Sequence, residues 1–126
     1  IMIDRQPQEK IPELLACCDA AFVSFMDNEL FTKTIPAKLQ SYMACGMPII
    51  ASASGETKRV IEDAKCGLCS DIGDAEGLCQ IINQMKQEDT QQMENNSREY
   101  YLANFEKKKL MDEMEEHFMK IMPYEK

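Results

Sequence analysis

The stretch TIPAKLQSYMACGMPIIASAS, residues 34–54, predicts a helix, a tight turn and a strand in that order. Pro36 suits the first turn of a helix, because its ring fixes φ and its missing N–H has no acceptor there. Gly46 is the residue expected just past the end of a helix. The apolar run Met47–Ala51 then predicts a buried strand. Apolar residues on one face of the predicted helix are Leu39, Tyr42 and Met43.

Strand signals recur on both sides of this stretch. Ala20–Phe25 is a continuous apolar run, as expected of a strand covered on both faces. Ile1–Ile3 is expected to be the end of another strand, and Gly67–Ser70 is short enough for an edge strand. Together these segments predict an α/β fold with a parallel sheet of about four strands.

Helical patterns separate these strands. A short helix is expected after Pro7, and another begins near Gly55. Asp74 is a favourable N-cap for a third helix. From Thr90 onward only helical patterns remain, and the second of two helices carries the apolar stripe Met111, Met114, Phe118 and Met122. Docking of that stripe onto the sheet, or onto a further domain, is the expectation.

The strand count bears on domain organisation. Complete doubly wound domains usually have five or six strands, so about four strands indicate a partial Rossmann-like sheet. We therefore expect residues 1–126 to be the second half of such a domain. Within it, 1–86 would form βα units and 87–126 the C-terminal helices.

Composition and charge exclude several classes of protein. The chain has 126 residues, 44% of them hydrophobic, which fits one globular domain. No apolar run approaches the roughly 20 residues of a membrane span, and IMIDRQPQEK does not resemble a signal peptide. A net charge of −8 argues against nucleic acid as a partner. Residues 33–65 nevertheless hold five basic against three acidic side chains, which makes this the stretch most favourable for a phosphate ligand.

Six cysteines are interpreted as reduced thiols in the core of a cytoplasmic protein. Cys66 and Cys69 have the C-x-x-C spacing of a redox site, but they follow a helix instead of starting one, which favours a structural role. A zinc site would need two more ligands, and His117, the single histidine, lies far along the last helix. No metal site is predicted.

Two strand-to-helix junctions are candidate anion sites, because ligands of α/β sheets bind near helix N-termini at strand carboxyl ends. The first runs as a loop from Phe25 to Pro36. Its phosphate donors would be the amides around Thr34–Ile35, the Thr34 hydroxyl, and Lys33 or Lys38. A solvated loop with two surface lysines is the alternative. The second junction offers the ligand-proximal candidates Ser54, Gly55 and Glu56, for which a purely structural helix start is the alternative.

An ordered set of motifs along the chain resembles the C-terminal domain of GT-B-fold glycosyltransferases of the group 1, family 4 type. The resemblance covers Pro7–Phe105, and each motif is weak alone while the ordered set is strong. The residues that carry it are Pro36, Lys38, Tyr42, Gly46, Pro48-Ile49-Ile50, Gly55, Val60-Ile61-Glu62, Gly67-Leu68 and Gly73–Leu78, with Ile11–Leu15 and Asp19-Ala20 upstream.

The resemblance implies a donor site for a nucleotide-diphosphate sugar, with a UDP-sugar as substrate and no metal or other cofactor. The two glutamates of the family pattern are absent, since Lys33 and Ser41 stand at their positions. The ribose contact is left to Gln40 or Ser41, and no residue is assigned a catalytic role. The implied donor-binding residues are Phe31, Thr32, Lys33, Thr34, Ile35, Lys38, Gln40 and Ser41.

The KLQSY form of the motif is similar to bacterial enzymes of surface-polysaccharide synthesis, including amino-deoxy-sugar transferases. That implies a membrane-presented acceptor and a cytoplasmic protein, peripheral at the inner membrane face. The N-terminal acceptor domain and the first half of the donor domain have no counterpart here, so the fragment alone is expected to be inactive. The alternatives are a non-catalytic α/β module that binds an anion or regulates, and a thiol redox module resting on Cys66 and Cys69.

Overall fold

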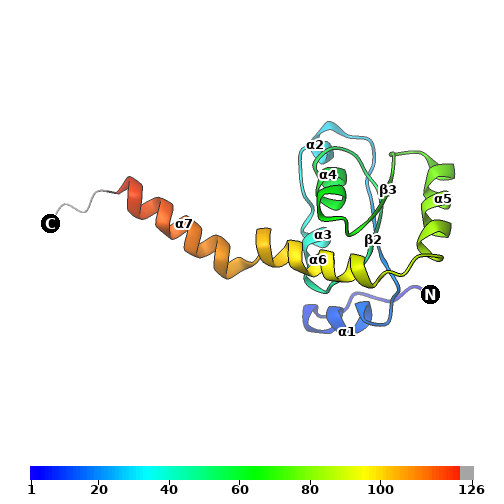
Figure 1. Cartoon of the computed structure of the whole chain (residues 1–126), viewed down its shortest axis with the longest axis horizontal. Coiled ribbons are helices and arrows are strands. Elements are labelled where there is room, and N and C mark those ends of the chain that lie inside the picture. Colours follow the sequence, from blue (N-terminus) through cyan, green and yellow to red (C-terminus); the bar gives the residue numbers. More distant parts are fainter. Residues whose placement is uncertain (123–126) are drawn as a thin grey trace.

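Three short parallel strands form the sheet of the computed structural model, which describes residues 1–122 (Figure 1). They are β1 (Ala21–Ser24), β2 (Ile49–Ser52) and β3 (Gly67–Ser70), hydrogen-bonded in the order β1-β2-β3. Ala21 lies opposite Ile49, which in turn lies opposite Gly67. This confirms the α/β class and the parallel, partial Rossmann-like sheet.

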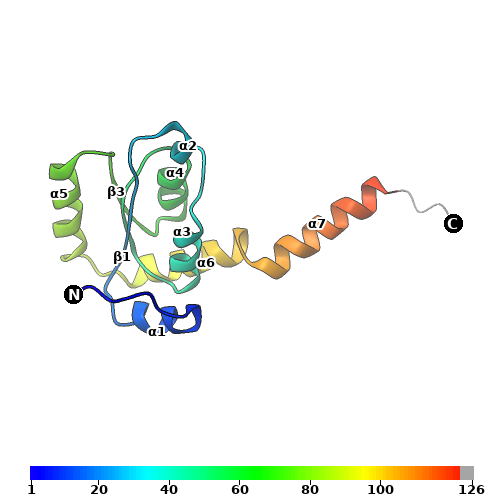
Figure 2. The same cartoon turned by 180° about the vertical axis from the view of Figure 1, so that it is seen from behind.

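Helices cover both faces of this sheet. The helix α5 packs on β2 and β3 from one side, while α3 and α4 pack from the other (Figures 1 and 2). The helix α6 runs across α3 and α4 on their outer side. The helical elements are η1 (Gln8–Lys10), α1 (Ile11–Leu15), α2 (Glu29–Thr32), α3 (Ala37–Ala44), α4 (Gly55–Ala64), α5 (Ala75–Met85), α6 (Gln91–Asn104) and α7 (Lys107–Ile121).

The local signals explain why α3 and α5 begin and end where they do. Pro36 precedes the first residue of α3, and Gly46 adopts a left-handed φ of +68° just beyond its end. Asp74 caps α5 by accepting a hydrogen bond from the Gly77 amide at 2.9 Å. The buried core between the sheet and its covering helices includes Val23, Leu39, Met43, Ile49, Val60 and Ile61.

Two strand predictions at the N-terminal side are wrong. Ile1–Ile3 forms no strand, and its side chains are exposed, so the described sheet has three strands instead of about four. The strand β1 is buried on one face only. It lies at an edge of the sheet, and α5, the helix on the other face, packs on β2 and β3. Phe22, on its other face, is 48% exposed.

The loop and cysteine predictions also need correction. The segment from Phe25 to Pro36 is not wholly irregular, because it contains the short helix α2, capped by the Asn28 side chain. Of the six cysteines expected in the core, only Cys66 is buried and Cys69 is half-buried. The other four are exposed and lie just beyond α1 (Cys17 and Cys18), just beyond α3 (Cys45) or within α5 (Cys79).

The helix α6 is fixed to the domain through the ends of three neighbouring segments. The Ser97 hydroxyl, which is fully buried, donates to the Met47 carbonyl at 2.8 Å. The Asn96 amide donates to the Lys65 carbonyl beyond the end of α4, and Arg98 donates to the Ala44 carbonyl at the end of α3. Carbonyls at helix ends lack intrahelical donors, so these side chains satisfy them.

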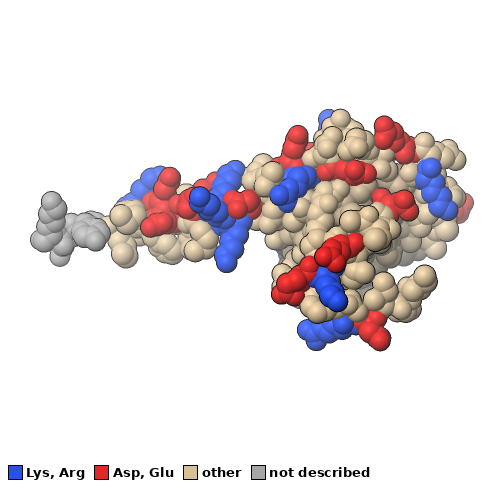
Figure 3. Space-filling model, turned by 90° about the horizontal axis from the view of Figure 1, so that it is seen from below, with Lys and Arg blue, Asp and Glu red and all other residues tan. Residues whose placement is uncertain are grey.

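The last helix, α7, projects away from the rest of the domain (Figures 1 and 2). Its predicted apolar stripe exists but does not dock onto the sheet, because Met111, Met114 and Phe118 are about half exposed. Basic and acidic side chains are interspersed along this helix (Figure 3). Across residues 1–122, none of the helices combines the length and the apolar character that crossing a membrane requires.

Candidate functional site

The carboxyl ends of the strands lie at one edge of the sheet, where helices begin. The helix α4 starts two residues after β2, and α3 starts beyond β1 after the loop that contains α2. First-turn N–H groups of a helix have no intrahelical acceptor and carry partial positive charge. This edge therefore offers the donors to which an anion binds.

The two predicted junctions touch one another here. The hydroxyl of Thr57, in the first turn of α4, donates to the Thr34 carbonyl at 3.2 Å. Gly55 has a left-handed φ of +61°, and a Cβ atom built on it would lie 2.0 Å from the Thr32 carbonyl oxygen. The backbone of Thr32 therefore occupies the space beside Gly55 that a side chain would otherwise fill.

Several predicted loop residues already have partners within the loop. The Phe31 ring stacks on Phe25 with their centroids 5.4 Å apart. The Thr34 hydroxyl donates to the Leu30 carbonyl, and the Thr32 hydroxyl donates to that of Glu29. Lys33 forms an exposed ion pair with Glu29, whose carboxylate lies 2.7 Å from its Nζ. A phosphate would compete with these contacts for Lys33 and for the Thr34 hydroxyl.

The second junction holds an ion pair of its own. Glu56 accepts hydrogen bonds from the Arg59 guanidinium, which lowers the pKa of this carboxylate. Arg59 also bonds Asp63, so its charge is engaged along α4. Ser54 immediately precedes α4, and its side chain forms no cap hydrogen bond.

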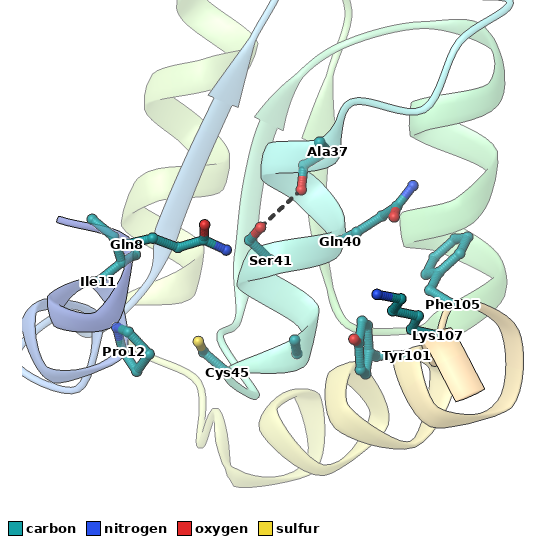
Figure 4. Close-up of a pocket in the computed structure, with 11 residues that line it drawn as sticks. Gln8, Ile11, Pro12, Ala37, Gln40, Ser41, Cys45, Tyr101, Phe105 and Lys107 are labelled. Carbon is teal, nitrogen blue, oxygen red and sulfur yellow. Dashed lines mark hydrogen bonds between the residues drawn. The ribbon is translucent and has the colours of Figure 1, made fainter. Parts of the chain in front are cut away.

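A groove crosses the outer face of α3 and contains both predicted ribose-contacting residues (Figure 4). Its volume is about 530 Å³, and Gln40 and Ser41 lie at its centre. Ala37, in the first turn of α3, also lines it, so the groove extends to the helix N-terminus. The Ser41 hydroxyl donates to the Ala37 carbonyl at 3.0 Å. The complete lining is Gln8, Ile11, Pro12, Ala37, Gln40, Ser41, Ala44, Cys45, Tyr101, Phe105 and Lys107.

The charge of this lining is unusual for so acidic a chain. Among the described residues that line the groove there is no carboxylate, and Lys107 supplies one cation. Four other cavities formed by residues 1–122 each have at least one Asp or Glu in their lining. A groove free of carboxylates avoids the repulsion that would oppose an anionic ligand.

Lys38 lies on α3 and is exposed, but it does not line the groove. It forms no ion pair within the part of the chain that the structure describes. Its position in the first turn leaves its ammonium free to meet a group bound at that helix end.

The described residues contain no cluster of three His, Cys, Asp or Glu side chains suited to a metal ion. Burial raises the pKa of Cys66 to about 11 and that of Cys69 to about 12. A redox cysteine needs a lowered pKa, so the pair does not have the electrostatics of a thiol redox site.

Several residues that line the groove carry no local sequence signal that marks them as ligand-contacting. Gln8 precedes residues 34–54, while Tyr101, Phe105 and Lys107 follow them much later in the chain. These residues meet only because η1, α6 and the start of α7 lie beside α3 in the fold. An aromatic residue such as Tyr101 on a predicted helix can lie in the core or line a cavity, and the sequence pattern does not distinguish the two.

Comparison with known proteins gives one match. The family model described as Glycosyl transferases group 1 matches residues 1–113, which is most of the chain. No curated protein and no solved structure matches the chain significantly.

Proposed function

The chain belongs to the group 1 glycosyltransferase family, and we propose that it binds the nucleotide-diphosphate sugar donor of a glycosyl transfer. The nucleoside occupies the groove on α3, and the diphosphate lies at the N-terminus of that helix. A UDP-sugar is the proposed donor, bound without a metal ion.

One observation carries this proposal, namely the carboxylate-free groove that reaches the first turn of α3. A nucleoside diphosphate has an apolar, hydrogen-bonding part joined to a strongly anionic part. The groove offers the neutral side chains of Gln8, Gln40 and Ser41 to the former. The N–H groups at the start of α3 offer an anion site to the latter.

The chemistry proposed for this end is stabilisation of the leaving group. As the bond from the sugar to the diphosphate breaks, negative charge grows on the diphosphate oxygens. Preorganised N–H donors and a nearby ammonium stabilise that charge more in the transition state than in the ground state. We assign the ammonium to Lys38 and the ribose contact to Gln40 or Ser41, which stand beside the anion site on the same helix.

The wider role that we propose is transfer of a sugar, of the amino-deoxy type, during surface-polysaccharide synthesis. The proposed setting is bacterial and cytoplasmic, with a membrane-presented acceptor. Acceptor recognition and the other donor contacts then come from parts of an enzyme beyond this half-domain. The exposed Phe22 on the edge strand β1 supports such a partner, because a large apolar side chain on an edge strand usually gains from being covered.

Calorimetric titration with UDP tests the site. We expect Lys38→Ala to weaken binding by about tenfold, because a charge-assisted bond to phosphate contributes roughly 1.5 kcal/mol. Lys120→Ala is the matched control, since this lysine lies near the far end of α7. Equal affinity of Lys38→Ala and the unaltered chain would remove the role given to Lys38.

The same titration separates the proposal from its alternative. A module that binds an unrelated anion, or regulates, would bind inorganic phosphate at the α3 N-terminus without preferring UDP. Selective binding of UDP supports the glycosyl-donor assignment, and absence of UDP binding rejects it.

A further inference from the structure

One side of the groove on α3 is built by the C-terminal helices. Tyr101 and Phe105 come from the end of α6, and Lys107 is the first residue of α7. In Figure 4 these three side chains stand with Gln40 on one side of α3, while Gln8 reaches toward Ser41 from the other side. The lining thus has two unlike walls, and only the C-terminal wall is aromatic.

Other side chains of α6 support the two aromatic residues of this wall. The Arg98 guanidinium carbon lies 5.7 Å from the centroid of the Tyr101 ring, within the range of a cation–π contact. The same guanidinium donates to the Ala44 carbonyl, and Ala44 and Tyr101 both line the groove. Arg98 therefore connects the Tyr101 ring to the C-terminal end of α3. The Phe105 ring packs against Tyr100, with their centroids 5.8 Å apart.

Two aromatic side chains facing a cavity beside a free amide form a surface suited to a planar heterocycle. A base stacks on such rings whatever its identity, and a side-chain amide offers both a donor and an acceptor to its edge. A purely apolar ligand would leave Gln40 and Lys107 without partners in the groove.

We propose that Tyr101 and Phe105 bind the nucleobase of the donor, that Gln40 hydrogen-bonds its edge, and that Arg98 is a positioning residue for Tyr101. This inference rests on the proposed function and adds which part of the nucleotide the C-terminal wall recognises. The ribose then lies nearer Ser41, and the diphosphate points toward the start of α3.

The test is a calorimetric titration of the whole chain with UDP. Tyr101→Leu keeps an apolar side chain against the core but removes the ring, so affinity should fall by about tenfold. Tyr101→Phe keeps the ring and should retain more of the affinity for UDP than Tyr101→Leu. Phe118→Ala is the matched control, because this exposed aromatic residue lies along α7 away from the groove.

Saturation-transfer NMR on the unaltered chain gives a readout that does not depend on any variant folding. The uracil protons should receive more saturation from the protein than the ribose protons. Arg98→Lys, which keeps the cation but loses the planar fork, should weaken UDP binding by about threefold and lower the uracil signal relative to the ribose signal.

The outcomes distinguish failure of the base-binding wall from failure of the proposed donor site. UDP binding that is equally tight in Tyr101→Leu, or uracil protons that receive less saturation than the ribose, overturns the base-wall assignment and leaves the proposed donor site in place. No UDP binding by the unaltered chain overturns both.

Discussion

The hydroxyl of Thr57, which has no exposed surface, donates a 3.2 Å hydrogen bond to the backbone carbonyl of Thr34. These residues are 23 positions apart. Thr34 lies in the first junction that the sequence marks as a candidate anion site, and Thr57 directly follows the second, which ends at Glu56. The bond holds the loop before α3 against the first turn of α4. The start of α3 is thereby fixed relative to the sheet.

Replacing Thr57 by Val should destabilise the domain by about 1–2 kcal/mol, because the isosteric side chain leaves the Thr34 carbonyl without its donor. Urea denaturation measures this loss. Thr57→Ser keeps the hydroxyl and should cost less than Thr57→Val. A midpoint for Thr57→Val equal to that of the unaltered chain would show that the bond adds no stability.

Gly55→Ala should be among the most damaging single changes in this chain. The new Cβ would lie 2.0 Å from the Thr32 carbonyl oxygen, and the φ of +61° disfavours any side chain. We expect a loss of at least about 3 kcal/mol. Gly73→Ala is the matched control, since its φ is +82° but no atom lies within 4 Å of the added Cβ, so about 1 kcal/mol is expected. Similar thermal midpoints for the two variants would contradict this account.

The buried thiols predict a loss of stability at alkaline pH. Burial raises the pKa of Cys66 from the ordinary 9.0 to about 11 and that of Cys69 to about 12. Well below pH 9 both thiols are protonated in the folded and unfolded chain, so they add no pH dependence there. Above pH 9 the unfolded chain loses these protons first, and stability falls as the pH rises toward 11.

Denaturation at pH 8, 9 and 10 measures that slope, with Cys66→Ala as the comparison. The variant should lose less stability between pH 9 and 10 than the unaltered chain. An equal slope in both would show that another group sets the alkaline limit.

Ser97→Ala should cost about 1–2 kcal/mol, because it removes the buried 2.8 Å bond to the Met47 carbonyl. Asn96→Ala removes a bond from the same helix to the Lys65 carbonyl, but that amide is not fully buried, so its loss should be smaller. Thermal unfolding compares the two. A larger loss for Asn96→Ala would mean that α6 is held mainly at α4 and not at the start of β2.

The sequence by itself determined the local elements and their order. Pro36 and Gly46 bound α3, Asp74 caps α5, and three of the predicted strand segments form parallel strands, because these signals act between residues a few positions apart. The motif order also pointed to the glycosyltransferase family, and the family match confirms this. Gln40 and Ser41 were named from the helix motif, and both lie in the groove.

Tertiary structure alone decided the rest. Apolar character does not show how many faces of a strand are covered, so it could not reveal that Phe22 is exposed or that Ile1–Ile3 forms no strand. Nor could local pattern bring Gln8, Tyr101 and Lys107 to one groove, because their meeting depends on how η1, α6 and α7 are placed around α3. Local signals fix the backbone of each element, whereas burial and cavity shape depend on contacts between elements that are distant in the sequence.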